Sequence, residues 1–276
     1  MPELPEVETV KETLKQLVLH QTIKKVDVYW PNIIKFPDGI ESFKRLLIGQ
    51  TIVDIKRKGK FLLFELDDFT LVSHLRMEGK YAVYGREKNE PLNKHTHVIF
   101  HFENGEELRY NDVRKFGTMH LFPKGTETGE QPLNQLGPDP FEATFNFEEF
   151  YRKIKKSGRV IKNILLDQTV IAGLGNIYVD ETLFKAGIHP ERRGSDISKE
   201  EAESLQRHAR ETLAQAIDQG GTTIRSYVNS QGQIGMFQQQ LFVYGQQDEP
   251  CKKCGAAITK IKVGGRGTHI CTACQK

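Results

Sequence analysis

Cysteine is absent from the first 250 residues of this 276-residue chain, and no apolar run approaches the length of a membrane span. Disulfide bonds therefore cannot stabilise most of the chain. We also expect no membrane-spanning helix. The start is charged and lacks the apolar segment of a signal peptide, so we expect a protein of the reducing cytoplasm. Internal repeats and low-complexity tracts are lacking too, and the length indicates a soluble protein of about two domains.

Basic charge is concentrated at the C-terminal end. The whole chain carries only +3, yet residues 251–276 contain six Lys or Arg residues and no Asp or Glu. The segment alone therefore carries +6, and the other 250 residues together carry −3. A small positive surface of this kind suits contact with phosphate and indicates a nucleic-acid partner.

The cysteines all belong to that segment: Cys251, Cys254, Cys271 and Cys274. They form two CxxC pairs separated by sixteen residues, the spacing of a structural zinc site whose two knuckles face each other across a hairpin. Disulfides and a redox-active CxxC are the alternatives. Four protein ligands would close the coordination sphere, so we expect the zinc to hold a fold and to do no chemistry.

The other end of the chain begins Met1-Pro2-Glu3-Leu4-Pro5. Removal of Met1 would leave Pro2 as a secondary amine with a carboxylate on the next residue. An α-amine has a pKa of about 8, so part of it is a free nucleophile near neutral pH. Attack of a secondary amine on a sugar aldehyde gives an iminium, an electron sink suited to cutting a glycosidic bond and eliminating phosphate. The alternative is that Pro2 and Pro5 only start a helix.

A stretch rich in Gly and Pro between Lys124 and Ala143 has the composition of a linker. Before it, Val7, Val10 and Leu14 recur at helical spacing, and short strands are expected at 23–30, 51–57, 61–66, 97–102 and 107–110. After it the pattern is helical, at 147–156, 160–166, 176–186 and 199–218. One helix followed by many short strands indicates a β-sandwich.

Two glycine-rich turns are candidate phosphate sites. Residues 172–176 (AGLGN) precede a predicted helix, whose N–H groups and dipole would receive one phosphate. The alternative is a simple capping turn with Asn176 as the cap. Residues 263–268 (VGGRGT) are expected to form a tight turn between the two knuckles, which brings Arg266 close to a ligand. Alternatively, the glycines only permit the turn and Arg266 is solvated.

The opening PELPEVE, residues 57–61 (RKGKF), the turn at 173–178 and the four-cysteine finger together resemble the bacterial formamidopyrimidine-DNA glycosylases. The resemblance runs from Pro2 to Cys274, with the motifs in the family's order. It implies an α+β fold of two domains: an N-terminal β-sandwich with an N-terminal helix, then a helix-two-turn-helix module and a zinc finger, with double-stranded DNA bound in the cleft between. We expect a catalytic domain at 1–124, a linker at 125–143, a helical domain at 144–238 and a zinc finger at 239–276.

The resemblance also implies an activity and the residues that perform it. Oxidised purines, chiefly 8-oxoguanine and formamidopyrimidines, would be excised, with β- and δ-elimination at the abasic site. Pro2 would attack the anomeric carbon while Glu3 handles the proton of the opening sugar ring. Lys60 would assist the first elimination and Arg266 the second, each at a phosphate. The remaining phosphate or DNA contacts implied are His74, His95, Asn176, Tyr244 and Lys260.

An enzyme that acts on a base within a duplex must flip it out and fill the hole that remains. The resemblance implies Met77, Arg114 and Phe116 as the fillers, because Met and Phe can wedge between base steps and Arg can pair with the orphaned base. Met77 and Phe116 would otherwise be core residues. Lys60 would otherwise belong to a solvated basic strand edge. Residues 229–235, within a long loop at 220–238, would close over the flipped base, or form an ordinary surface loop.

Two other functions are compatible with these residues. An endonuclease VIII-like glycosylase shares the terminal proline and glutamate but removes oxidised pyrimidines; Met77, Arg114, Phe116 and the long loop favour the purine enzyme. A non-catalytic zinc-finger DNA-binding protein would not need the Pro2-Glu3 terminus.

The resemblance to the purine enzymes also implies the cofactor, the partner and the location of the protein. We expect a bacterial, nucleoid-associated monomer that binds damaged double-stranded DNA, carries one structural Zn²⁺ per chain and has no membrane partner.

Overall fold

The computed structural model describes residues 1–85, 91–143, 145–222 and 235–276. The chain divides into two compact units. The first, here the β unit, contains Met1–Asn134, and the second, here the helical unit, contains Gln135–Thr222 and Met236–Lys276. Among the described residues, no helix has both the length and the apolar character needed to cross a membrane.

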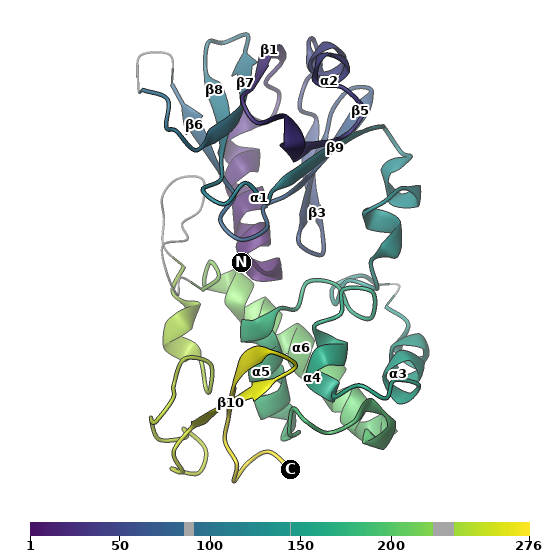
Figure 1. The fold of residues 1–276 in the computed structure, drawn as a ribbon, viewed down its shortest axis with the longest axis vertical. Helices are drawn as coiled ribbons and strands as arrows, with labels where there is room; N and C mark the ends of the chain where they lie inside the picture. The colour runs from purple at the N-terminus through teal and green to yellow at the C-terminus, as the bar shows by residue number, and fades with distance from the viewer. Residues whose placement is uncertain (86–90, 144, 223–234) are drawn as a thin grey trace. The chain divides into compact units, whose positions relative to one another are not determined.

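The β unit begins with a helix and continues mainly as strands (Figure 1). Its elements are α1 (Leu4–Val18), β1 (Ile23–Val28), η1 (Pro31–Ile33), β2 (Ile34–Phe36), α2 (Ile40–Leu47), β3 (Asp54–Lys58), β4 (Phe61–Glu65), β5 (Phe69–His74), β6 (Lys80–Tyr84), β7 (Thr96–Phe102), β8 (Glu107–Asn111), β9 (Thr118–Pro123), η2 (Glu127–Gly129) and η3 (Leu133–Gln135, whose last residue opens the helical unit). One sheet has the order β1-β7-β8-β6 and the other β2-β9-β5-β4-β3; neighbouring strands are antiparallel except β2 and β9.

Both sheets and α1 contribute to a single core. Val7, Val10, Leu14 and Val18 lie three or four residues apart, so they share one face of α1, and all four are buried. They belong to the same apolar cluster as side chains of both sheets, among them Phe64. The helix, purple in Figure 1, packs against β3 and β4. The expected arrangement of a β-sandwich with an N-terminal helix is therefore confirmed.

The helical unit contains α3 (Phe147–Lys155), α4 (Ile161–Leu165), α5 (Asn176–Ala186), η4 (Gly194–Asp196), α6 (Lys199–Asp218), η5 (Phe237–Gln240), β10 (Thr259–Val263) and β11 (Arg266–Ile270). The predicted helices at 176–186 and 199–218 have the bounds expected. A local signal fixes the start of α6, because Ser198 and Glu201 form a capping box. The β10–β11 hairpin packs against α5 through β11, and α5 packs along α6.

Candidate functional site

Pro2 and Glu3 lie just ahead of α1, and both are buried. Glu3 is the N-cap of the helix, and its backbone N–H donates to the Glu6 carboxylate at 2.8 Å. Pro5 stands in the first turn, where the N–H that proline lacks would have no helical partner. Helix initiation therefore accounts for Pro5 but not for Pro2, which precedes the helix. The fold places a proline nitrogen and a carboxylate at the positive end of the α1 dipole.

Lys60 occupies the two-residue turn between β3 and β4. Lys58 pairs with Phe61 across the hairpin, and Gly59 has a φ of +56°, which glycine adopts without steric cost. The Lys60 side chain is only 5% exposed. The alternative of a solvated strand edge is therefore wrong, because a lysine is seldom buried to this extent without a specific role or partner.

Arg57 braces this turn against the first helix. Its Nε donates to Oε2 of Glu8 on α1 at 2.6 Å, and its Nη1 donates to the carbonyl of Gly59 at 3.0 Å. Burial of Glu8 opposes ionisation, but hydrogen bonds from Lys11 and Arg57 outweigh it and hold the pKa of Glu8 below its usual value. The charged pair fixes the turn that carries Lys60 to the helix that follows Pro2.

His74, at the end of β5, is buried and neutral. Its Nδ1 accepts a hydrogen bond from the backbone N–H of Arg76 at 2.9 Å, and its ring meets the edge of Phe61 at a centroid distance of 4.4 Å. Burial, helped by the positive charges of Arg76 and Lys60, lowers the pKa of His74 to about 3. Because Nδ1 accepts, the single proton of the neutral ring belongs on Nε2, which makes that atom a donor suited to a phosphate oxygen.

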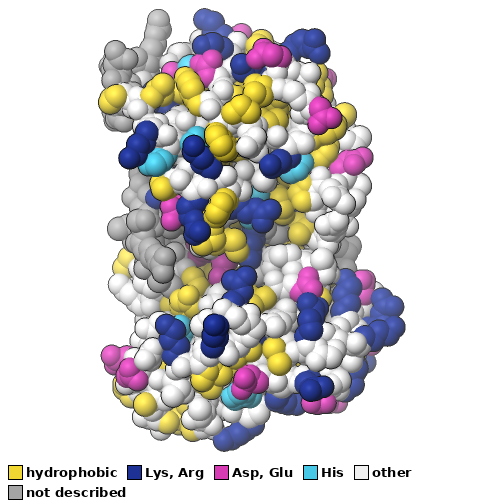
Figure 2. Space-filling view, viewed as in Figure 1, with side chains coloured by type: hydrophobic (Ala, Val, Ile, Leu, Met, Phe, Trp, Pro, Cys, Tyr) yellow, Lys and Arg dark blue, Asp and Glu magenta, His cyan; other side chains and the backbone are white. Residues whose placement is uncertain are grey.

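Met77 and Phe116 reach the surface, with 38% and 51% of their side chains exposed. The alternative that they are core residues is therefore wrong. The Arg114 guanidinium carbon lies 4.9 Å from the centre of the Phe116 ring. Figure 2 shows hydrophobic side chains reaching the surface of the β unit among Lys and Arg side chains. Large exposed apolar groups are typical of a surface that meets a partner.

In the helical unit, Asn176 is the first residue of α5 and not its cap, which is Gly175. The alternative interpretation, in which Asn176 caps the helix, is wrong for this reason. Its Nδ2 donates instead to the carbonyl of Gly267 at 2.9 Å. The side chain therefore joins the N-terminus of α5 to the β10–β11 hairpin.

The hairpin has a two-residue turn at Gly264 and Gly265, shorter than the tight turn expected at 263–268, because strand β11 already begins at Arg266. Gly264 and Gly265 have φ values of +54° and +78°, the pattern of a type I′ turn. A Cβ on Gly264 would lie 2.0 Å from Oδ1 of Asn163, so a side chain has no room there. Arg266, the first residue of β11, and Lys260 on β10 are both exposed. The hairpin thus presents both of these cations on one small sheet.

A buried ion pair attaches this hairpin to α5. Lys162 Nζ donates to Oδ1 of Asp180 at 2.6 Å and to Oγ1 of Thr268 at 2.8 Å, and both charged side chains are fully buried. The second carboxylate oxygen of Asp180 accepts the backbone N–H of His269 at 2.9 Å. The strand that begins with Arg266 is therefore held through its backbone and through Thr268.

Glu181, the next residue of α5, anchors a second segment. Its carboxylate accepts the backbone N–H groups of Phe242, Val243 and Tyr244, each at 2.9 Å. Burial raises the pKa of Glu181, although these three donors favour its ionised form. Tyr244 is half-buried and meets the edge of the His269 ring at a centroid distance of 4.9 Å. Successive residues of one helix thus position the two segments that carry Tyr244 and Arg266.

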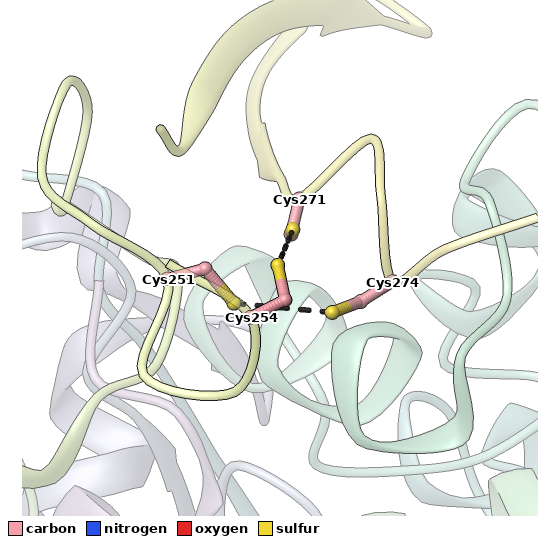
Figure 3. A group of neighbouring side chains, drawn as sticks. All are labelled: Cys251, Cys254, Cys271 and Cys274. Carbon is pink, nitrogen blue, oxygen red and sulfur yellow. Dashed lines mark hydrogen bonds between the residues drawn. The ribbon is translucent and has the colours of Figure 1, made fainter. Parts of the chain in front are cut away.

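The four cysteines meet in one cluster (Figure 3). Their sulfur atoms all lie within 4.8 Å of one another; Cys251 and Cys274 are 3.9 Å apart, and Cys254 and Cys271 are 3.5 Å apart. A tetrahedral zinc with Zn–S bonds of about 2.3 Å requires S···S separations of about 3.8 Å. A disulfide requires about 2.0 Å, so the disulfide alternative is excluded. The geometry and the donor set fit one structural Zn²⁺.

Few apolar side chains of the finger's own support this cluster. The buried set around it consists of Val243, Cys251, Ile258 and Cys271, together with Phe184 from α5. A core this small depends on the metal for its stability.

Two further sequence expectations concern a loop and a histidine. The expected loop at 229–235 lies, up to residue 234, outside the described residues. Of the other expected DNA contacts, His95 is half-buried, and its carbonyl accepts the backbone N–H of Asp112 at 3.0 Å.

Sequence reasoning gave no role to Arg57, Asp112, Lys162, Asp180 or Glu181. The partners of these buried charged residues include residues distant in the sequence, up to 106 positions away in the case of Lys162 and Thr268. For Asp180 and Glu181, the local signal is a pair of acidic residues within an otherwise apolar stretch, between Val179 and Leu183.

Family models match three parts of the chain. Residues 1–119 match the formamidopyrimidine-DNA glycosylase N-terminal domain, residues 136–228 its H2TH domain, and residues 248–276 the zinc finger found in FPG and IleRS. The formamidopyrimidine-DNA glycosylase of Oceanobacillus iheyensis is 64% identical over all of this chain and 98% of its own length. That of Bacillus subtilis is 58% identical over all of this chain and 99% of its own length.

Solved structures agree with these matches. Lactococcus lactis Fpg in complex with DNA containing an abasic site is 43% identical, with a TM-score of 0.91 over 99% of both chains. A point mutant of the same Lactococcus enzyme in complex with Fapy-dG-containing DNA is also 43% identical, with a TM-score of 0.92 over the whole of both chains. From these relationships, together with the four-cysteine zinc site and the fold, the chain is a member of the formamidopyrimidine-DNA glycosylase family.

Proposed function

We propose that this protein excises oxidised purines, 8-oxoguanine and formamidopyrimidines, from double-stranded DNA and then cleaves the strand at the abasic site. The observation that carries the proposal is the buried Pro2–Glu3 pair at the start of α1. Relatives of this chain support the substrate class, since they are named formamidopyrimidine-DNA glycosylases and have been solved with abasic and Fapy-dG DNA.

The Pro2 nitrogen is the nucleophile once Met1 has been removed, because in the Met1–Pro2 peptide it is an amide without basicity. It attacks C1′ of the damaged nucleotide, and the C1′–N bond breaks as the base leaves. Glu3 takes the proton that the Pro2 nitrogen loses and delivers it to the ring oxygen as the C1′–O4′ bond breaks and the iminium forms. A carboxylate one residue from the nucleophile is within reach of the same sugar.

Elimination follows from the iminium, which withdraws electrons from the sugar. Loss of a proton from C2′ expels the 3′-phosphate, and a further proton loss expels the 5′-phosphate. Lys60 stabilises the phosphate in the first step, and Arg266 does so in the second. His74, His95, Asn176, Tyr244 and Lys260 contact the DNA, chiefly at phosphates. The burial of Lys60 supports a cation in a fixed position for the first elimination. The exposure of Arg266 supports a cation whose side chain can extend to the phosphate in the second.

Met77, Arg114 and Phe116 fill the space that the flipped base leaves. Their exposure in the β unit supports this role, because an exposed methionine and phenylalanine gain by entering a base stack. Zinc, held by Cys251, Cys254, Cys271 and Cys274, stabilises the finger that presents Lys260 and Arg266.

The domain limits at 1–124, 144–238 and 239–276, with a linker at 125–143, remain predictions. We further propose that the protein acts as a monomer in the bacterial cytoplasm, associated with the nucleoid, because its substrate is there.

Borohydride trapping tests the chemistry. The processed protein should form a covalent adduct with 8-oxoguanine duplex, because borohydride reduces the iminium to a stable amine. Protein that retains Met1 is the control and should form none; normal trapping by that form would contradict the assignment of Pro2. Preference for thymine glycol duplex would indicate the endonuclease VIII-like activity, and no adduct on either substrate would indicate a DNA-binding protein without this chemistry.

A further inference from the structure

Asp112 organises the turn that carries Arg114 and Phe116. Its carboxylate is 1% exposed and accepts backbone N–H groups from Arg114 at 3.0 Å, Phe116 at 2.9 Å and Gly117 at 2.8 Å. Three donors from one turn therefore converge on one buried anion, a charge-assisted arrangement that specifies the backbone of the turn. We call residues 112–117 the Arg114 turn.

The position of Asp112 is itself fixed from the neighbouring strand. Its backbone N–H donates to the carbonyl of His95 at 3.0 Å, and its carbonyl accepts from Nε2 of His97 at 2.7 Å. The backbone of Asp112 is thus bonded to β7 and to His95 just before it, while its carboxylate accepts the N–H groups of the turn. The backbone carbonyl of His95 contributes directly to this anchor.

A second turn, residues 75–79, carries Met77 and meets the first at the hydroxyl of Tyr110. This hydroxyl donates to Oδ2 of Asp112 at 3.5 Å. A Cβ on Gly117 would lie 1.8 Å from the hydroxyl oxygen, and a Cβ on Gly79 would lie 2.2 Å from it. Both glycines are therefore packed against the same atom. Gly79 also closes its own turn, because its N–H donates to the carbonyl of Leu75 at 2.9 Å.

Each of the two turns holds a residue in an unfavourable backbone conformation. Arg76 has a φ of +53° and Lys115 a φ of +59°, in the left-handed region that residues other than glycine seldom adopt. Such conformations persist only where the surrounding contacts determine them. In both turns the residue lies next to a proposed filler, Met77 in one and Arg114 and Phe116 in the other.

We propose that Tyr110 and Asp112 are positioning residues that join the two turns into one preformed wedge, so that Met77, Arg114 and Phe116 enter the base stack together. The inference rests on the proposed function, in which these three side chains fill the space left by the flipped base. Neither Tyr110 nor Asp112 need touch DNA, since both are buried. A preformed wedge lowers the entropic cost of inserting three side chains at once.

The test compares Tyr110→Phe with Tyr81→Phe. The two tyrosines are both buried, and their rings are in contact at a centroid distance of 5.1 Å. The hydroxyl of Tyr81, however, donates to Oγ of Ser73 at 2.7 Å, in β5 and outside both turns. Each of the two variants therefore removes one buried hydroxyl from the same core. Only the hydroxyl of Tyr110 contacts both turns.

Three measurements are made on each variant and on Asp112→Asn. They are the single-turnover rate on 8-oxoguanine duplex, the fluorescence of 2-aminopurine opposite the lesion, and borohydride trapping on a single-stranded abasic oligonucleotide. Tyr110→Phe should slow excision about 3- to 10-fold, and Asp112→Asn, which removes a charged acceptor, about 10- to 100-fold. Both should weaken the 2-aminopurine signal and reduce discrimination by the opposite base. Trapping on the single strand, which has no stack to fill, should be unchanged.

Tyr81→Phe should match the wild type in all three measurements. Excision by Tyr110→Phe at the rate of Tyr81→Phe would overturn the inference, and so would equal losses on duplex and single-stranded substrates. If Asp112→Asn does not fold, the tyrosine pair alone decides. Absence of trapping by the wild type on either substrate would instead refute the proposed function, so the two failures are distinguishable.

Discussion

Replacing Lys162 with methionine should weaken the attachment of the zinc hairpin to α5. Methionine keeps most of the length and the apolar stem of lysine but removes the charge, so Asp180 would remain as an unpaired carboxylate in a fully buried position. The bond to Thr268 would be lost at the same time. The carbonyl of Gly267, next to Arg266, would keep its hydrogen bond from Asn176. It would lose the one from Lys162 Nζ, which is 3.3 Å long.

The expected loss follows from the burial of both partners. Removing one member of a buried pair costs about 3–5 kcal/mol, because the remaining charge is desolvated without compensation. With a urea m value of about 2 kcal/mol/M, the midpoint for the helical unit should fall by about 1.5–2.5 M. Lys162→Met with Asp180→Asn should recover at least about 1 kcal/mol, since the amide is neutral and its oxygen still accepts the N–H of His269.

Two probes separate the units in one titration. The only tryptophan of the chain, Trp30, belongs to the β unit, so its fluorescence reports that unit. Release of zinc to a colorimetric chelator reports the helical unit. Lys162→Met should move the zinc-release midpoint and leave the Trp30 midpoint in place. An unmoved zinc-release midpoint would refute the reasoning, and so would a double variant less stable than the single one.

Three further outcomes are expected. Cys254→Ser should release zinc and abolish DNA binding while the Trp30 transition persists; unchanged affinity would show that the finger does not bind DNA. Glu3→Gln should lower base excision by about 10²–10⁴-fold yet keep lyase activity on a preformed abasic site, since Pro2 remains; equal loss of both would indicate that Glu3 mainly positions Pro2. His74 takes up its proton at a pKa of about 3 when folded and 6.5 when unfolded, so stability should fall as the pH drops from 6.5 towards 3. His74→Asn, which keeps an acceptor for Arg76 and does not titrate, should show a flatter dependence in Trp30-monitored urea unfolding; an equal slope would contradict the assignment.

Where the signal for an element is local, the sequence predicts it well. The helix at 199–218 starts at a capping box, and its buried positions recur at helical spacing. The eight residues of α2 (Ile40–Leu47) were not predicted, because they bury only Phe43 and Leu47, too few to establish a period. Strands β2, β5, β6 and β9 were also missed. β5 is buried at nearly every position, so it does not alternate between apolar and polar residues.

The same distinction applies to the candidate site. Residues that lie in compact motifs, such as Pro2, Lys60 and the cysteines, can be identified from spacing and from family resemblance. The residues that hold them in place cannot, since their partners are distant: Arg57 bonds Glu8 across 49 positions and Asp180 bonds His269 across 89. Residue type alone would also misplace two of these side chains. A lysine is expected at the surface and a phenylalanine in the core, but Lys60 is buried and Phe116 is exposed.

The exposed residues of the proposed site have little packing of their own to fix them, so their positions must be set through the backbone. In the part of the chain that the structure describes, buried carboxylates do this repeatedly: Asp112 receives three N–H groups near Arg114, and Glu181 receives three at residues 242–244. A carboxylate suits the task, because its two oxygens accept several donors at once and each bond is charge-assisted. It follows that substitutions at these acids should reduce activity without removing any DNA contact. Loss of activity alone therefore does not identify a residue as part of the chemistry.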